Sequence, residues 1–112
     1  MTSDAGEPPK ASDLDRLVHE PARLMITAYL AVVERADMLF VQRQTGLTLG
    51  NLSSHVSKLE AAGYVAVEKT FVGKRPRTML RLTELGRAAL DGYRTRMQRM
   101  LNTLPDDAKE GT

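Results

Sequence analysis

Residues 46–63 read GLTLGNLSSHVSKLEAAG, and this stretch decides the fold. Thr48 is a residue type that caps helix N-termini, and Gly63 is one that ends helices. Between them the apolar residues recur at steps of three and four, the spacing of one helix face; they are Leu49, Leu52, Val56 and Leu59. The pattern predicts an amphipathic helix from Thr48 to Ala62 with a narrow buried stripe.

The opposite face of this predicted helix has side chains suited to reading DNA. At about 100° per residue it carries small, polar or basic residues and no acid, namely Gly50, Asn51, Ser54, Ser57 and Lys58. Asparagine bonds adenine through two hydrogen bonds, serine suits several bases, and lysine reaches guanine or phosphate. With Thr48 and Ser53 added, this is the predicted DNA-binding face, although an ordinary solvated helix face would look similar in isolation.

Another predicted helix precedes this one. Asp37 is a suitable cap for it and Gly46 a suitable end. Between them lie Leu39, Phe40 and Arg43. Two helices joined by a tight turn that contains glycine form a helix-turn-helix, in which the second helix enters the major groove and reads base edges.

After Gly63 the apolar period changes from helical to two. Tyr64 to Phe71 and Thr78 to Leu82 have extended character, with turn residues between them, so a β-hairpin is predicted. Between Lys58 and Arg81 six basic residues accompany two acidic ones. We expect the tip to lie along phosphates or in the minor groove, as a wing; its basic residues are Lys74, Arg75 and Arg77. A solubility or edge-guarding role is the alternative.

Two further helices are predicted before this pair. The first spans Asp13 to His19, with Ser12 or Asp13 as its cap. Pro21 suits the first turn of the second helix. The face expected to be buried in this central helix recurs at steps of three and four and contains Leu24, Met25, Ala28, Tyr29, Val32 and Val33.

The last predicted helix begins at Thr83 and runs for about twenty residues, roughly 30 Å, to Leu104. Near its start, Leu85, Ala88 and Ala89 are expected to pack on the domain's own core. Beyond them apolar residues recur at heptad spacing. Such a stripe could pack on the domain's own core, but the helix is longer than so small a domain can cover, which predicts contact with a second copy of the chain. The expected homodimer contact contains Leu90, Tyr93, Met97, Met100, Leu101 and Leu104, together with Leu14 and Leu17 of the first helix.

Composition excludes several classes of site. The chain has 112 residues, a net charge of +2 and no cysteine, so disulfides, thiolate metal sites and thiol redox sensing are excluded. With His19 and His55 as the only histidines, we expect no metal and no cofactor. His55 flanks the buried stripe, where packing or capping is favoured over base contact. No nucleophile with a matching base is apparent, so no enzyme activity is expected.

The predicted organisation is one domain at 13–104 between a disordered leader at 1–12 and a flexible tail at 105–112. No apolar run approaches the roughly 20 residues that span a bilayer. We therefore expect a cytoplasmic protein without membrane contact.

Three separated segments resemble winged-helix regulators related to the MarR and ArsR groups. They are LDRLVHEPARL at 14–24, GNLSSHVSKLEAAGYV at 50–65, and RPRT at 75–78 leading to LTELGR at 82–87. The resemblance covers residues 13 to about 95 and implies an α+β fold, mainly α with a small β-hairpin: a winged helix-turn-helix with a long C-terminal dimerisation helix. It also implies DNA binding, dimerisation and usually repression. The lack of cysteine departs from metal-sensing ArsR proteins.

These patterns predict a transcription regulator, usually a repressor, that binds specific double-stranded DNA as a homodimer. A winged-helix module that docks another protein without binding DNA is the alternative. A docking wing is expected to carry apolar anchors at its tip, whereas Gly73 to Arg77 carries three positive charges and no such anchor. The sequence does not specify the operator or any small-molecule effector.

Overall fold

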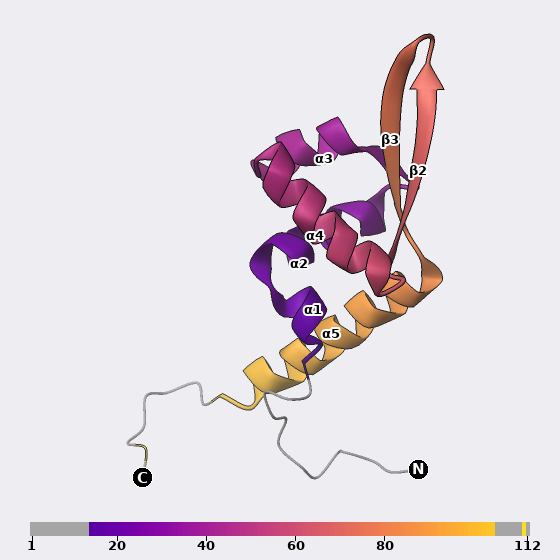
Figure 1. The fold of residues 1–112 in the computed structure, drawn as a ribbon. Helices are drawn as coiled ribbons and strands as arrows, with labels where there is room; N and C mark the ends of the chain where they lie inside the picture. The colour runs from indigo at the N-terminus through magenta and orange to yellow at the C-terminus, as the bar shows by residue number, and fades with distance from the viewer. Residues whose placement is uncertain (1–13, 105–110, 112) are drawn as a thin grey trace.

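The computed structural model describes residues 14–104 and residue 111. The predicted leader at 1–12 and all of the predicted tail except residue 111 lie outside the described residues. The elements, in chain order, are α1 (Arg16–His19), α2 (Pro21–Val32), β1 (Ala36–Asp37), α3 (Met38–Thr45), α4 (Leu49–Ala61), β2 (Val65–Val72), β3 (Arg75–Leu82) and α5 (Glu84–Asn102). The architecture is the predicted α+β winged helix-turn-helix, with β1 added (Figure 1).

The chain enters the body through a single helical turn, α1. The Asp15 carboxylate caps this turn by accepting hydrogen bonds from the N–H groups of Leu17 at 2.9 Å and Val18 at 3.2 Å. The predicted cap, Ser12 or Asp13, lies outside the described residues and is too early in the chain. Asp15 has the same capping chemistry and lies directly before the helix.

Helix α2 lies at the centre of the body and packs against α1, α3, α4, α5 and β3. Its buried residues are Ile26, Thr27 and Leu30. The predicted buried face is therefore wrong, since Met25 and Val32 are 43% and 79% exposed. The remaining predicted members are exposed or only partly buried: Leu24, Ala28, Tyr29 and Val33. Apolar residues occupy nearly every side of this helix, so helical spacing fits more than one face, and the packing partners decide which is buried.

The helix-turn-helix pair forms as predicted. Helix α3 begins behind Asp37, whose carboxylate accepts a hydrogen bond from the Leu39 N–H at 2.7 Å. It ends at Gly46, whose φ of 73° is the left-handed conformation that glycine adopts without strain. Helix α4 begins behind Thr48, whose hydroxyl accepts from the Asn51 N–H at 3.1 Å. Local capping chemistry thus fixes both ends of the turn.

The buried stripe of α4 belongs to one aliphatic core. Leu52 and Leu59 are fully buried and Val56 is 4% exposed. Leu49, predicted in the same stripe, is 49% exposed, because it lines a groove that faces the wing rather than the core. The other buried apolar side chains of this core are Leu14, Val18, Ile26, Leu30, Ala36, Val41, Val65, Leu80, Leu82, Leu90 and Tyr93.

Strands β2 and β3 form the predicted hairpin, or wing. Their antiparallel register runs from Val65 opposite Leu82 at the root to Val72 opposite Arg75 at the tip. Gly73 supplies the turn with a φ of 63°. The hairpin projects well beyond the helices (Figure 1). β1 pairs with the other edge of β3 and has two residues, too few to show a period of two in the sequence.

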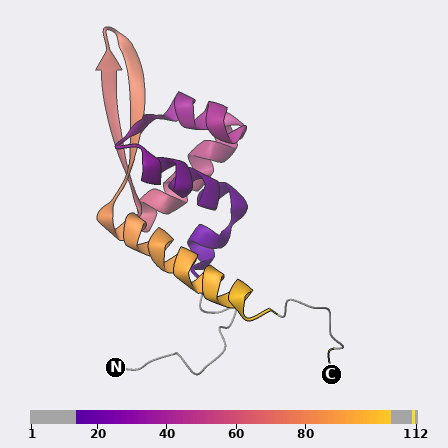
Figure 2. The same cartoon turned by 180° about the vertical axis from the view of Figure 1, so that it is seen from behind.

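Helix α5 begins behind Thr83, whose hydroxyl accepts a hydrogen bond from the Gly86 N–H at 3.0 Å. Gly86 lies against the Tyr64 backbone with no room for a side chain, which sets the rotation of the helix. Leu85 and Ala88, predicted to pack on the core, are therefore exposed. The C-terminal part of α5 extends past the body (Figure 2). Neither α5 nor any other described helix is long and apolar enough to cross a membrane.

Candidate nucleic-acid interface

Helix α4 presents the predicted reading face to solvent. Every residue predicted to contact DNA from this helix is exposed, namely Thr48, Gly50, Asn51, Ser53, Ser54, Ser57 and Lys58. The Thr48 hydroxyl is already used as the helix cap, so its role there is structural. The remaining residues form an uncharged strip that ends at one lysine, and the N-terminus of the helix adds the positive end of its dipole.

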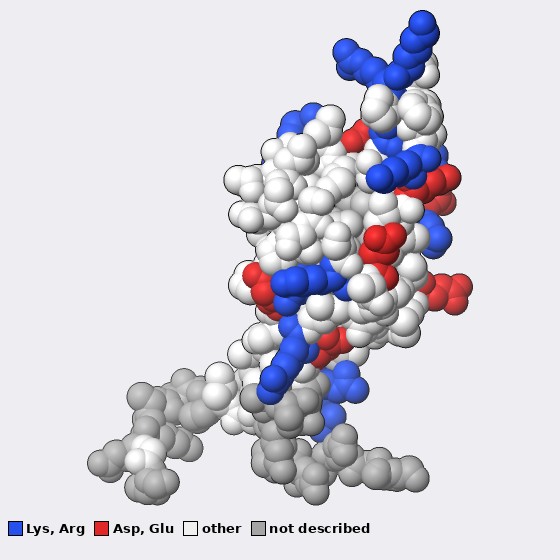
Figure 3. Space-filling model, in the orientation of Figure 1, with Lys and Arg blue, Asp and Glu red and all other residues white. Residues whose placement is uncertain are grey.

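The wing tip carries two cations without a carboxylate partner among the described residues. Lys74 and Arg75 are exposed, and neither belongs to an ion pair in this part of the chain. Figure 3 shows Lys and Arg side chains gathered at the end of the hairpin, above a largely uncharged surface. Clustered, unneutralised positive charge of this kind attracts polyanions.

Arg77, predicted with the tip cations, is placed differently. Its Nε donates to the Asp37 Oδ2 at 2.8 Å, so it ties β3 to the residue that caps α3. The hydrogen bond from the Leu39 N–H, and then the Arg77 guanidinium, hold the pKa of Asp37 below its usual value. Arg77 therefore holds the wing against the start of α3 and has its charge largely neutralised. Arg35 and Glu68 form a similar exposed pair at 3.3 Å.

A groove of about 380 Å³ separates the first turn of α4 from the wing. Leu49 and Ser53 line it from α4, and Pro76 and Thr78 line it from β3. Helix and wing thus border one concave strip. A duplex that places its major groove on α4 would bring an adjacent backbone or minor groove to the wing.

Sequence reasoning missed two apolar residues at the wing tip. Phe71 is 67% exposed and Val72 is 55% exposed, directly before the turn. The expectation of a tip without apolar anchors considered only Gly73 to Arg77 and is wrong for the tip as a whole. Two consecutive apolar residues at a strand end were the available signal, because both faces of a projecting hairpin are open to solvent there.

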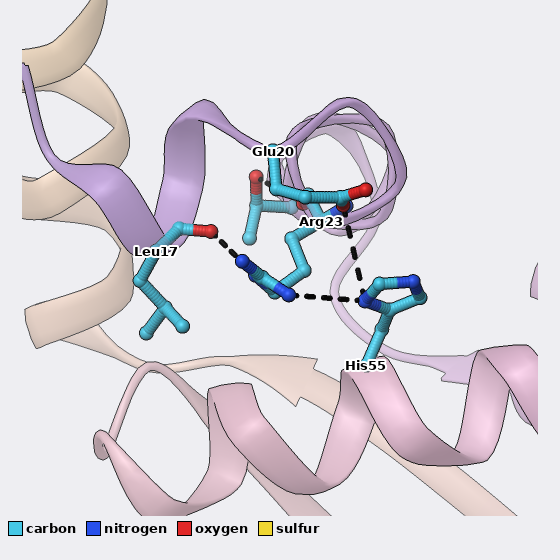
Figure 4. Close-up of polar contacts among 5 residues, drawn as sticks. Leu17, Glu20, Arg23 and His55 are labelled. Atoms are coloured by element: carbon cyan, nitrogen blue, oxygen red, sulfur yellow. Dashed lines mark hydrogen bonds and ion pairs between the residues drawn. The ribbon is translucent and has the colours of Figure 1, made fainter.

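His55 connects α4 to the junction between α1 and α2 (Figure 4). Arg23 Nη1 donates to His55 Nδ1 at 3.2 Å, while Arg23 Nε donates to the Leu17 carbonyl at 2.7 Å. Glu20 Oε1 lies 3.8 Å from the same His55 nitrogen. Burial acts to raise the pKa of Glu20, but the Arg23 N–H and the nearby charges outweigh it, so the pKa is lowered. His55 thus packs between helices, as its position on the stripe's flank suggested.

Two tyrosines connect α1 to the rest of the body. The Tyr64 hydroxyl donates to Asp15 Oδ2 at 2.7 Å, and this bond, with partial burial, raises the pKa of Tyr64 to about 12. His19 Nδ1 and the Tyr93 hydroxyl of α5 are 2.8 Å apart. Both histidines of the chain are therefore held in protein contacts. No three histidine, aspartate or glutamate side chains lie together as metal ligands would within residues 14–104.

The residues predicted for a dimer contact divide into three groups. Leu14, Leu90 and Tyr93 are at most 8% exposed and belong to the protomer's own core, because α1 and the first half of α5 pack together there. Leu17, Met97 and Met100 are partly buried against that core. Leu101 and Leu104 are 56% and 62% exposed. A groove of about 470 Å³ runs between α2 and α5, lined among others by Ala28, Val32, Met97 and Leu101.

Comparison with known proteins agrees with this architecture. Over residues 22–101 the chain matches the family described as winged helix DNA-binding domain. An uncharacterized protein of Methanocaldococcus jannaschii is 31% identical over 78 residues, which cover 70% of this chain and 85% of that protein.

Solved structures of transcriptional regulators share this architecture. A transcriptional regulator homologue from Pyrococcus horikoshii OT3 has a TM-score of 0.75 and 28% identity, over 80% of this chain and 88% of that one. The PcaV transcriptional regulator of Streptomyces coelicolor shares the fold with a TM-score of 0.65 and 22% identity, over 85% of this chain and 69% of that one. On the family match and these likenesses, the chain belongs to the winged helix DNA-binding domain family.

Proposed function

We propose that this chain is a sequence-specific regulator of transcription that binds double-stranded DNA as a homodimer in the cytoplasm. The observation that carries the proposal is the exposed, acid-free strip on α4 beside a wing tip whose cations lack carboxylate partners among the described residues. Helix and wing border one groove, so a duplex lying across them meets both. Membership of a DNA-binding family supports the same function.

Helix α4 and the wing make different kinds of contact with DNA in this proposal. In the major groove, Asn51 and Ser54 of α4 read base edges. Lys58 and the tip cations Lys74 and Arg75 contact phosphates, which positions the protein without specifying sequence. Arg77 serves this arrangement indirectly, by holding the wing against the start of α3.

The homodimer rests on apolar surface that the protomer leaves uncovered. Met25 and Val32 of α2, Leu101 of α5 and Leu104 just after α5 are between 43% and 79% exposed, and Val32 and Leu101 line the groove of about 470 Å³ between the two helices. Monomers rarely leave such neighbouring apolar side chains in water. A second copy packed here through a two-fold axis would cover both sets at once, because an isologous contact uses each patch twice.

The resemblance to repressors favours repression as the outcome of binding. A dimer on two half-sites occupies about two turns of duplex. Where such a site overlaps a promoter, the bound dimer excludes the transcription machinery by steric overlap.

Selection of bound fragments from random double-stranded DNA tests this function. We expect one motif to be enriched, with inverted half-sites whose centres lie about 34 Å apart. The double variant Asn51→Ala with Ser54→Ala is the matched control, because it keeps the wing cations and should enrich no motif. A wild-type pool without any enriched motif contradicts sequence-specific binding, and enrichment of isolated half-sites contradicts the dimer.

A protein-docking module remains the second candidate, and the exposed Phe71 and Val72 are the observation that favours it. Its wing would use these apolar side chains as anchors for a partner protein. The cations beside them argue for a polyanion instead. A folded protein that shifts no duplex DNA in an electrophoretic assay at low salt would favour docking, whereas retained duplex binding argues against it.

A further inference from the structure

Phe71 is a large apolar side chain held in water at the far end of a projecting hairpin. It is 67% exposed and lies opposite Pro76 across the two strands. No core surrounds it, and it is not among the residues packed against the core. Burial of its aromatic surface would therefore be favourable only against something outside the protomer.

The strand register shows which way this side chain is directed. Residues directly opposite each other in an antiparallel pair lie on the same face, and alternate residues of one strand do so as well. Phe71 thus shares a face with Pro76 and Thr78, which line the groove beside α4. Val72, paired with Arg75, lies on the other face. Nearer the body the same face carries Leu80 and Leu82, which are buried in the core, so Phe71 is on the side of the wing that faces the helices.

The charges around this tip select the kind of partner. Lys74 lies in the turn, and Arg75 directly follows it. Lys69 lies on the same face as Phe71, two residues nearer the root of the hairpin. None of these three has a carboxylate partner within residues 14–104. The partner surface must therefore combine an apolar slot with negative charge on both sides. The minor groove of a duplex has this composition, with stacked bases between two rows of phosphates.

Side chains at the tip, rather than the whole hairpin, fit this partner. The minor groove of B-DNA is about 6 Å wide, so it admits side chains from the end of the hairpin while the strand pair, whose axes alone lie about 4.8 Å apart, stays at its rim. Gly73, whose φ of 63° is the left-handed conformation that glycine adopts without strain, allows the tight turn that presents these side chains. Proteins that enter this groove use apolar side chains, phenylalanine among them, as wedges that partly unstack a base step.

We propose that Phe71 is a minor-groove wedge that reads the deformability of the base step beneath the wing. This inference rests on the proposed DNA-binding function and adds a specificity element to it. Pyrimidine–purine steps such as TA open most easily, so the wing should favour them at a position where it makes no base-edge hydrogen bond. Lys74 and Arg75 hold the tip on the flanking phosphates while the ring enters.

The test places 2-aminopurine, whose fluorescence rises on unstacking, at successive steps of a selected duplex on the side covered by the wing. Wild type should raise the fluorescence at one step, and Phe71→Ala should not. Val72→Ala is the matched control, because it removes an exposed apolar side chain from the same tip on the opposite face. Replacing a TA step at that position by GG should weaken wild type about tenfold and should weaken Phe71→Ala less than twofold.

The outcomes separate the two proposals. Fluorescence that responds to Phe71→Ala but not to Val72→Ala supports the wedge. Tight duplex binding in which no step brightens, or in which the two variants behave alike, overturns the wedge and leaves the DNA-binding function standing. Duplex affinity that is unchanged when Phe71 is removed overturns the wedge as well, and assigns the ring to a protein or a lipid surface. A folded wild type that binds no duplex overturns the DNA-binding function and the wedge together. Because Phe71 is exposed, the alanine variant should keep the wild-type melting temperature.

Discussion

Arg75 and Arg77 lie two positions apart on β3, but the structure gives them different surroundings. Arg75 is exposed at the tip, whereas Arg77 is bonded to Asp37 at 2.8 Å. We expect Arg75→Ala to weaken binding to preferred and random duplexes alike, and to reduce the salt slope by about one per subunit. Arg77→Ala should leave the slope almost unchanged and lower the free energy of unfolding by about 0.5 kcal/mol, as exposed pairs do. Titrations at several salt concentrations and urea unfolding measure the two effects; equal slope changes would place Arg77 on the phosphates.

Asn51 and Ser54 are exposed on α4 and carry no charge, so their substitution tests specificity without changing the electrostatics. Alanine at either position should cost about 1 to 3 kcal/mol on the selected operator, because a base-edge hydrogen bond is lost. Affinity for random duplex should stay nearly constant. Competition between the two duplexes in an anisotropy assay measures the ratio. If these variants keep their sequence preference and the wing variants lose it, α4 is not the reading helix.

At the scale of elements, α1 is a single turn that polar contacts attach to the segment after α4 and to α5. One of them is the hydrogen bond from the Tyr64 hydroxyl to Asp15, which raises the pKa of Tyr64 from 10.0 to about 12. Because the folded pKa lies above the unfolded one, the stabilisation is fully present below pH 10 and is lost as the pH rises through 12. Wild type should therefore lose stability more steeply over that interval than Tyr64→Phe.

Urea unfolding followed from neutral to alkaline pH measures this difference. Tyr29→Phe is the matched control, because the Tyr29 hydroxyl donates to a backbone carbonyl, that of Gln44 at 3.4 Å, rather than to a carboxylate. A control variant that flattens the alkaline loss as much as Tyr64→Phe does would show that the Asp15 contact is not its cause.

The elements also show how far the sequence predicts this molecule. The caps at Asp37 and Thr48 and the ends at Gly46 and Gly63 were predictable because they depend on neighbours in the chain. The reading face of α4 followed from its single clear stripe. The buried face of α2 was not predictable, since this helix is apolar on more than one side. In α5 a distant contact, Gly86 on the Tyr64 backbone, decides the rotation, and Leu90 and Tyr93 of the predicted dimer stripe lie in the protomer's own core.

The candidate site shows the same division between local and distant information. The tip cations were predictable from composition and turn chemistry. Pairing of Arg77 with Asp37 was not, because it depends on β1 lying against β3, and β1 is too short to leave a pattern. Phe71 was counted as ordinary strand, and only the projection of the hairpin past the body reveals that it has nothing to pack on.

For the whole molecule, the dependence of DNA affinity on salt reports how many subunits engage. Lys58, Lys74 and Arg75 are exposed and outside the ion pairs formed in the described part of the chain. If each neutralises one phosphate, a dimer displaces the counterions of about six and the log–log slope is near −5, whereas a single subunit gives about −3. Filter binding across a salt series gives the slope. A slope near zero would mean that the cations do not touch the backbone.

The uncovered apolar surface of α2 and α5 leads to the last prediction, which concerns assembly. Val32 is 79% exposed and Leu101 is 56% exposed, and both line the groove between these helices. The double variant Val32→Glu with Leu101→Glu should sediment as a monomer. In a two-fold contact both subunits would bring the two new carboxylates into the same apolar interface, where burying a charge is costly. Thr95→Glu adds one such charge to an exposed position of α5 outside the groove and should remain dimeric.

The monomeric variant should keep the wild-type circular dichroism spectrum, since neither side chain is in the core, and its salt slope should fall toward the single-subunit value. A double variant that sediments as wild type would place the dimer contact on another surface of the molecule.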